Sequence, residues 1–120
     1  MENSTLKVIV AGGRDFFDYK LLCKKLYIIL SKKENVIIVS GEAKGADKLG
    51  ERYAREHNLA ISSFPAIWNQ HGSRAGFIRN EEMAKNADAC VCFWDGKSVG
   101  TKHMIQTAET MKLKLRIINY

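Results

Sequence analysis

The sequence predicts an α/β protein with a Rossmann-like, three-layer sandwich fold, in which a parallel five-stranded sheet carries helices on both faces. Short apolar runs alternate along the chain with longer segments whose apolar residues recur at helical spacing. Glycine-bearing turns follow three of the apolar runs, as is usual where a strand leads into a helix. Consecutive strand–helix–strand units predict right-handed crossovers and a parallel sheet covered on both faces, and for such a sheet we expect the strand order 3-2-1-4-5.

The first half of the chain contains two strand–helix pairs. Residues 6–11 form an apolar run typical of a buried strand, and a helix capped by its leading aspartate is expected over 18–31. The second strand is expected over 36–40. The helix that follows, over 46–57, carries Gly50 on its apolar stripe, which permits close packing on the sheet.

The second half continues the alternation, with a polar and aromatic connection over 66–73. Its first strand alternates apolar and polar residues, which places it near an edge of the sheet. The expected elements are strands over 60–64, 88–94 and 115–118, and helices over 73–87 and 101–112.

Composition and charge limit the classes of protein to which the chain can belong. At 120 residues, 46% of them hydrophobic, the chain is long enough for one domain spanning residues 1–120. Three cysteines argue against a disulfide framework, and we expect Cys90 and Cys92 to point to opposite faces of their strand. The first five residues lack the features of a leader and no run is long enough to span a membrane, which predicts a cytoplasmic protein without membrane contact. The formal charge of +6 favours anionic partners.

The three glycine-bearing turns are the most informative feature of the chain. They span 11–14, 40–47 and 95–101. The carboxyl ends of parallel strands share one edge, and the predicted order places the topological switch between the first and fourth strands. Glycine lets backbone N–H groups approach a phosphate, and the N-terminus of the next helix adds partial positive charge. We therefore expect an anionic, nucleotide-derived small molecule to contact Gly12, Gly13, Gly41, Gly45, Gly96 and Gly100.

Polar side chains beside these turns are further candidate contacts. Arg14 can stack on a base or grip a phosphate, and Arg79 can fork onto phosphate oxygens. Ser40 can donate to a phosphate or cap its turn locally. Asn80 lies on the apolar stripe of its helix, so its amide should point inward, towards the glycine turns or a ligand.

Other residues near the turns have a structural interpretation beside the functional one. Asp47 is interpreted mainly as a structural residue that caps free N–H groups at the start of its helix or compensates the helix dipole, and Thr101 suits either an anion or a helix cap. His103 is either a surface helix residue or a general acid or base. Trp68 is the preferred platform for a stacked base, because aromatic residues in its loop are hard to explain as core. No histidine or cysteine pair has metal-site spacing, and no cofactor is expected.

Self-association is a further expectation. Phe16, Phe17 and Phe77 are apolar residues near loops that a monomer would leave partly exposed. Domains of this size often pair through helices or an edge strand, so a homo-oligomer is expected.

Four blocks of the sequence, taken together, resemble a known family. They are AGGRDF at 11–16, SGEAKGAD at 40–47, RNEEM at 79–83 and WDGKSVGTKHM at 94–104. In this order they resemble the signature blocks of YspA-type SLOG domains, within the SMF/DprA and LOG superfamily of Rossmann-like folds. The resemblance covers nearly the whole chain and implies binding of nucleotides or nucleotide derivatives. Within that superfamily some members are phosphoribohydrolases, some bind single-stranded DNA, and others are proposed sensors of nucleotide signals.

The chain departs from the hydrolase pattern at one place. LOG-type hydrolases carry a glutamate two or three residues after a Gly-Gly-x-Gly-Thr block, where this chain has His103 and Met104. Arg79 matches the arginine of that group without its carboxylate partner. The leading interpretation is therefore a nucleotide-binding domain, with N-glycosidic hydrolysis and single-stranded nucleic-acid binding as alternatives. No catalytic residue is assigned; the carboxylates available as substitutes are Asp15, Asp47, Glu81 and Asp95.

Overall fold

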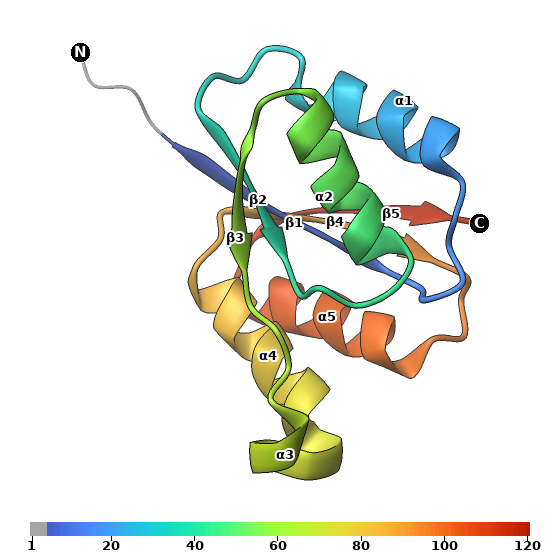
Figure 1. Ribbon diagram of the computed structural model, residues 1–120, viewed down its shortest axis with the longest axis vertical. Coiled ribbons are helices and arrows are strands. Elements are labelled where there is room, and N and C mark those ends of the chain that lie inside the picture. Colours follow the sequence, from blue (N-terminus) through green and yellow to red (C-terminus); the bar gives the residue numbers. More distant parts are fainter. Residues whose placement is uncertain (1–4) are drawn as a thin grey trace.

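The computed structural model describes residues 5–120, and its element order is the strand–helix alternation expected above. The elements are β1 (Leu6–Gly12), α1 (Tyr19–Leu30), β2 (Val36–Ser40), α2 (Ala46–Glu56), β3 (Ala60–Ser63), α3 (Trp68–His71), α4 (Ala75–Lys85), β4 (Ala89–Trp94), α5 (Val99–Thr110) and β5 (Lys114–Asn119), with a 3₁₀ turn at Gly72–Arg74 between α3 and α4. The strands are parallel and follow the order β3-β2-β1-β4-β5. Figure 1 shows α1 and α2 on one side of the sheet and α4 and α5 on the other. The predicted fold class and strand order are confirmed.

The two faces of the sheet carry separate cores because side chains alternate along each strand. Val8 and Val10 of β1 pack with the apolar faces of α1 and α2, whereas Ile9 and Ala11 pack with α4 and α5. Gly50 brings α2 close to the sheet, since a Cβ there would lie 2.8 Å from the Cβ of Val10. The strand ends are therefore held between two helical layers.

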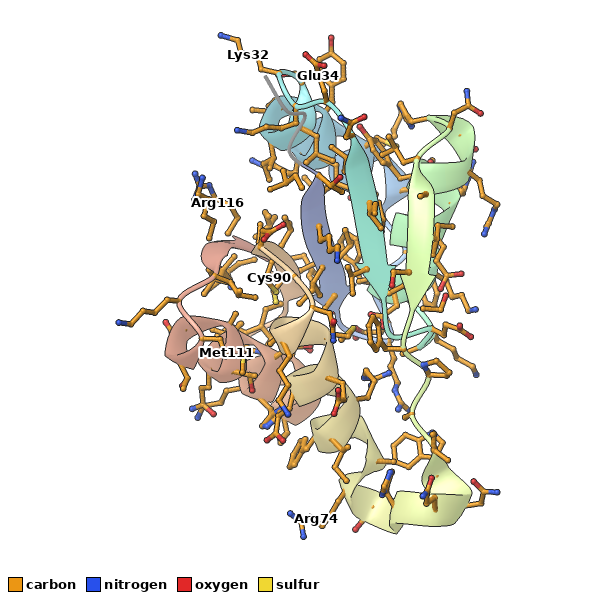
Figure 2. All side chains as sticks on the ribbon, turned by 90° about the vertical axis from the view of Figure 1, so that its left-hand side faces the viewer. Lys32, Glu34, Arg74, Cys90, Met111 and Arg116 are labelled. Carbon is orange, nitrogen blue, oxygen red and sulfur yellow. The ribbon has the colours of Figure 1, made fainter. Side chains whose placement is uncertain are left out.

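The prediction for the two cysteines of β4 is wrong. Cys90 and Cys92 are two residues apart in a strand, so they share a face, and their sulfur atoms lie 3.5 Å apart in the core beneath α4 and α5. Figure 2 shows Cys90 inside the molecule. Together with Cys23 they are free thiols.

The segment expected to be a plain connection contains a short helix. Residues 68–71 form α3, which projects with the start of α4 away from the sheet (Figure 1). The helical period was not recognisable there because no residue of α3 is buried. The expected exposure of Phe16 is also wrong: it is buried and stacks on Phe93 with ring centroids 4.7 Å apart, while Phe17 is 68% exposed.

Within residues 5–120, no helix is both long enough and apolar enough to cross a membrane. The prediction about a leader concerned the start of the chain, of which residues 1–4 lie outside the described residues.

Candidate functional site

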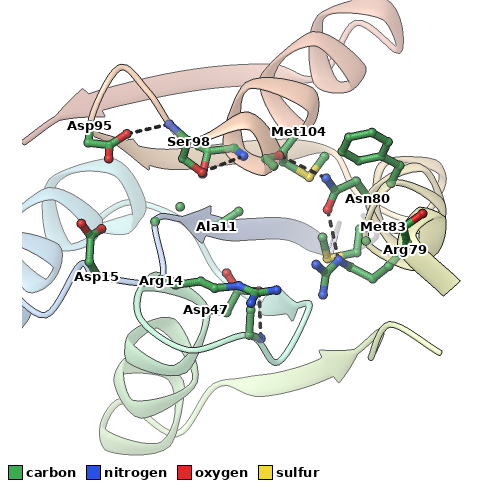
Figure 3. A pocket seen from close by; sticks show the side chains of 18 of the residues that line it. Ala11, Arg14, Asp15, Asp47, Arg79, Asn80, Met83, Asp95, Ser98 and Met104 are labelled. Atoms are coloured by element: carbon green, nitrogen blue, oxygen red, sulfur yellow. Dashed lines mark hydrogen bonds between the residues drawn. The ribbon is translucent and has the colours of Figure 1, made fainter. Parts of the chain in front are cut away.

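A cleft of about 450 Å³ opens at the carboxyl ends of β1, β2 and β4. It lies beside the β1–β4 pair, where the strand order reverses, which is where open parallel sheets bind ligands. Figure 3 shows side chains from the turns after these strands and from α4 facing one another. The cleft is lined by Ala11, Gly12, Gly13, Arg14, Asp15, Ala43, Asp47, Trp68, Ser73, Gly76, Phe77, Arg79, Asn80, Met83, Asp95, Ser98, Gly100, Thr101 and Met104.

The first two glycine turns pack directly against each other. The N–H of Ala46, the first residue of α2, donates to the carbonyl of Gly13 over 3.2 Å. Gly45 has a φ of +80°, and a Cβ there would overlap the carbonyl of Gly13 and the backbone of Arg14. Glycine is needed at this position both for its conformation and for the close approach. The two turns therefore form one continuous wall of the cleft.

Two guanidinium groups meet on this wall. Arg79 reaches from α4 across the carboxyl end of β2, where its Nη1 donates to the carbonyl of Gly41 over 2.6 Å. Its Nε donates to Oδ1 of Asn80 over 3.1 Å. Burial lowers the pKa of Arg79; the charge of Asp47 opposes that fall and the charge of Arg14 adds to it. Arg14 extends towards Arg79 in Figure 3. Two neighbouring cations repel each other unless an anion is present, so this part of the cleft suits a phosphate group.

Asp47 lies next to these arginines. Its interpretation as a helix cap is wrong, although it stands in the first turn of α2, where a carboxylate compensates the helix dipole. The capping position of α2 is Gly45, which offers no side chain, and the Asp47 carboxylate accepts instead from the N–H of Ala43 over 3.3 Å. Asp47 is only 4% exposed. Burial raises the pKa of Asp47 to about 6, although Arg79 and the N–H groups of Ala43 and Gly41 act in the opposite direction. A carboxyl group that titrates near neutrality beside a guanidinium in a cleft is typical of functional sites.

Two further carboxylates lie at the other end of the cleft, away from Arg79 in Figure 3. Asp95 accepts from the N–H groups of Lys97 and Ser98, each over 2.8 Å, and these bonds lower the pKa of Asp95. Asp15 accepts from the hydroxyl of Tyr120 over 2.6 Å. The cleft is therefore basic at one end and acidic at the other, which suits a ligand with a phosphate at one end and hydroxyl groups at the other.

Two aromatic rings border the same cleft. Trp68 of α3 is 50% exposed and Phe77 of α4 is 40% exposed. Partly open aromatic faces beside a phosphate-sized cationic region are suited to stacking on a base.

Comparison with known proteins identifies the family of the chain. A model of the YspA, cpYpsA-related SLOG family matches residues 6–71, which is more than half of the chain. The chain belongs to this family. The Gene 61 protein of Mycobacterium phage D29 is 32% identical to this SLOG domain over 121 residues, and the alignment covers 95% of each chain.

A solved structure shares the fold of the SLOG domain. DNA processing protein A from Helicobacter pylori, described for its single-stranded DNA binding mode, superposes with a TM-score of 0.71 at 22% sequence identity. The match covers 95% of this chain and 65% of that one, so the SLOG domain spans less than two thirds of its structural neighbour. At this identity the similarity shows a common fold.

The SLOG domain brings most of the predicted contact residues into the cleft. Those that line it are Gly12, Gly13, Arg14, Trp68, Arg79, Asn80, Gly100 and Thr101. Gly41 lines an adjoining cavity of about 160 Å³ that also borders Arg14 and Arg79. The amide of Asn80 points inward as expected, and it donates to the carbonyl of Gly100 over 3.3 Å.

Three predicted residues line neither the cleft nor the adjoining cavity. The buried hydroxyl of Ser40 donates to Glu51 over 2.6 Å and accepts from the N–H of Glu42, so it caps its turn locally. Gly45 joins the two turns, and Gly96, with a φ of +85°, supplies a turn conformation that other residues rarely adopt. These residues shape the backbone of the site.

Helix capping at the third turn also differs from the prediction. Ser98 caps α5, and its side chain accepts from the N–H of Thr101 over 3.4 Å, so Thr101 lies within the first turn of the helix. The hydroxyl of Thr101 is hydrogen-bonded to that of Ser98 over 3.1 Å.

Sequence reasoning missed several residues that line the cleft. Gly76 and Met83 share a face of α4 with Asn80, so helical spacing from Asn80 would have found them. Asp15 and Asp95 were considered only as substitute carboxylates, and Asp47 mainly as a structural residue of its helix. The others are Ala11, Ala43, Ser73, Ser98 and Met104. Within residues 5–120 no three histidine, cysteine, aspartate or glutamate side chains gather closely enough to hold a metal ion.

Proposed function

We propose that this SLOG domain binds a nucleotide or nucleotide derivative in the cleft at the β1–β4 switch, with its phosphate on Arg14 and Arg79. The observation that carries the proposal is the meeting of two guanidinium groups on a wall made by two glycine turns. The exposed faces of Trp68 and Phe77 border the same space and offer stacking surfaces for a base. Binding without turnover would give the domain the role of a sensor of a nucleotide signal.

Calorimetry with nucleoside monophosphates and ADP-ribose tests this proposal. Replacement of Arg79 by alanine should weaken binding by roughly ten- to a hundredfold, because a charge-assisted contact contributes about 1.5–3 kcal/mol. The matched control is Arg116→Ala, which removes the same charge from β5 on a part of the molecule remote from the cleft lining (Figure 2). Failure of every nucleotide to bind at millimolar concentration would refute the proposal, as would equal effects of the two substitutions.

Hydrolysis of an N-glycosidic bond is a second candidate function, favoured by Asp47. Cleavage of such a bond passes through an oxocarbenium-like transition state, which a nearby carboxylate stabilises or supplies with an activated water. Asp47 is a cleft carboxylate within electrostatic reach of Arg79, and its pKa of about 6 lets it accept a proton near neutral pH. It is therefore a candidate for the carboxylate partner that Arg79 lacks in the sequence pattern.

Chromatographic detection of a free base from a nucleoside monophosphate distinguishes the two candidates. Release that is abolished in Asp47→Asn while the nucleotide still binds would make the domain a hydrolase; binding without release supports the sensor. Affinity for oligothymidylate that rises with length and falls steeply with salt, without affinity for mononucleotides, would instead indicate the single-stranded DNA binding described for the structural neighbour.

A further inference from the structure

A chain of hydrogen bonds connects Arg79 to a histidine that lies outside the cleft lining. Arg79 Nε donates to Oδ1 of Asn80 over 3.1 Å. Nδ2 of Asn80 lies 3.1 Å from Nδ1 of His103 and donates to the carbonyl of Gly100 over 3.3 Å. Asn80 is only 5% exposed, so these protein groups, rather than bulk water, decide how its amide is oriented.

The donor and acceptor roles along these hydrogen bonds follow from the groups at their ends, Arg79 and the carbonyl of Gly100. A guanidinium only donates, so the atom of Asn80 that faces Arg79 is the oxygen; a carbonyl only accepts, so the atom that faces Gly100 is the nitrogen. The same amide nitrogen faces Nδ1 of His103, and that ring nitrogen must therefore be the acceptor. His103 is consequently neutral in this arrangement, with its proton on Nε2.

A proton on Nδ1 of His103 is incompatible with this arrangement. It would place an N–H group against the N–H groups of the Asn80 amide. A flip of the amide relieves this contact, but it places the amide nitrogen against Arg79 Nε and the amide oxygen against the carbonyl of Gly100. The flip therefore removes the acceptor that holds Arg79 Nε. We propose that His103 is a pH-dependent positioning residue, whose neutral ring locks Asn80 in the orientation that supports Arg79 and whose protonation frees Arg79 Nε from Asn80, while Nη1 keeps its bond to the carbonyl of Gly41.

The surroundings of His103 fit such a role. Phe77 stacks on the imidazole with ring centroids 4.2 Å apart, and burial lowers the pKa of His103, so the neutral ring is favoured. The charged group that faces the ring is Glu81 of the packed helix α4, whose Oε2 lies 3.8 Å from Nε2 and opposes that shift. Beyond Asn80 lies the positive charge of Arg79, which disfavours a second positive charge on the ring.

Nuclear magnetic resonance of the unliganded protein tests the positioning role directly. The measured quantity is the exchange rate of the Arg79 Nε proton divided by that of Arg116, so that the general pH dependence of exchange cancels. Between about pH 7.5 and about pH 5 the ratio should rise at least roughly tenfold, with a midpoint equal to that of the His103 ring signals. A ratio that does not change, or that changes with a different midpoint, overturns the proposal.

Two variants assign the response to its group. His103→Asn places a non-titrating oxygen near the position of Nδ1, so the Arg79 proton should stay protected at both pH values. Asp47→Asn removes the other titrating group beside Arg79 and should leave the response in place. A response that persists in His103→Asn, or that disappears in Asp47→Asn, overturns the role of His103.

The consequence for ligands rests on the proposed phosphate-binding role of Arg79 and is measured separately. Sulfate is the probe, because it keeps its full charge across this range, and its affinity for Asp47→Asn should depend on pH only while His103 is present. If the exchange ratio responds but sulfate binds at neither pH, the proposed function fails while the positioning role of His103 stands.

Discussion

Replacement of Asp47 by asparagine should make the folded protein more stable at neutral pH. Burial raises the pKa of Asp47 from 3.8 to about 6, so folding at pH 7 must keep a carboxylate charged where it prefers to be neutral. At 1.36 kcal/mol per pH unit, a shift of about two units corresponds to a penalty of about 3 kcal/mol. Asparagine removes that penalty, which already includes the opposing attraction of Arg79, but its amide NH2 group cannot accept a hydrogen bond from one of the two backbone N–H groups, those of Ala43 and Gly41, that act on the carboxylate. We therefore expect a net gain of roughly 1–2 kcal/mol, or about 4–8 °C in Tm.

The sign of the pH dependence provides an independent check. A raised carboxyl pKa means that the folded state holds the proton more tightly, so this contribution to stability is complete below about pH 4 and is lost as pH rises through about 6. In urea denaturation, the advantage of Asp47→Asn should therefore shrink by roughly 2 kcal/mol between pH 7 and pH 4. Asp18→Asn is the matched control, because Asp18 caps α1 through the N–H of Leu21 and asparagine preserves that cap. If Asp47→Asn instead lowers the free energy of unfolding by about 1 kcal/mol at pH 7, the charged carboxylate stabilises the fold and the burial penalty inferred here is refuted.

Three other substitutions separate backbone roles from binding roles. Gly45→Ala should destabilise the protein by more than about 2 kcal/mol in urea denaturation, because a φ of +80° is strained for alanine and the contact with Gly13 leaves no room for a Cβ. Gly100→Ala should be neutral or stabilise the protein by up to about 1 kcal/mol, because no heavy atom lies within 4 Å of the new Cβ. Ser40→Ala should cost about 1–3 kcal/mol of stability, because the Ser40 hydroxyl donates to Glu51, and nucleotide affinity measured by calorimetry should be unchanged. A comparable loss of affinity would show that Ser40 contacts the ligand. Self-association remains a prediction: light scattering should show a dimer that Phe17→Ser converts to a monomer, and a monomeric wild-type protein at micromolar concentration would refute it.

The fold was predictable because its determinants are local in sequence. The apolar runs of β1, β2 and β4 and the helical stripes between them are visible residue by residue, and the crossover rule then orders the strands. The glycine turns were equally informative, because the switch point follows from the strand order. The helix α3 was not predictable, since it has only four residues and none of them is buried.

The candidate site was predictable as a set of positions but not as a set of partners. Arg79 and Asn80 were recognised as candidates from the sequence. Only the distances between the side chains indicate that His103 orients Asn80 and that Asn80 in turn orients Arg79. Asp47 shows the same limit. Its place beside the start of α2 suggested a cap, whereas the turn before it folds so that Ala43 donates to the carboxylate and burial follows.

The arginine–aspartate neighbourhood joins the two helical layers of the molecule. Asp47 belongs to α2, which packs on one face of the sheet, and Arg79 belongs to α4, which packs on the other. Arg79 crosses the end of β2 to reach the carbonyl of Gly41, so one side chain links the second helical layer to the turn that leads into the first. An anion held by Arg14 and Arg79 would compensate the repulsion between them and strengthen this link. Ligand binding should therefore protect amides at the start of α2 and in the middle of α4 together, even though the two helices lie on opposite faces of the sheet.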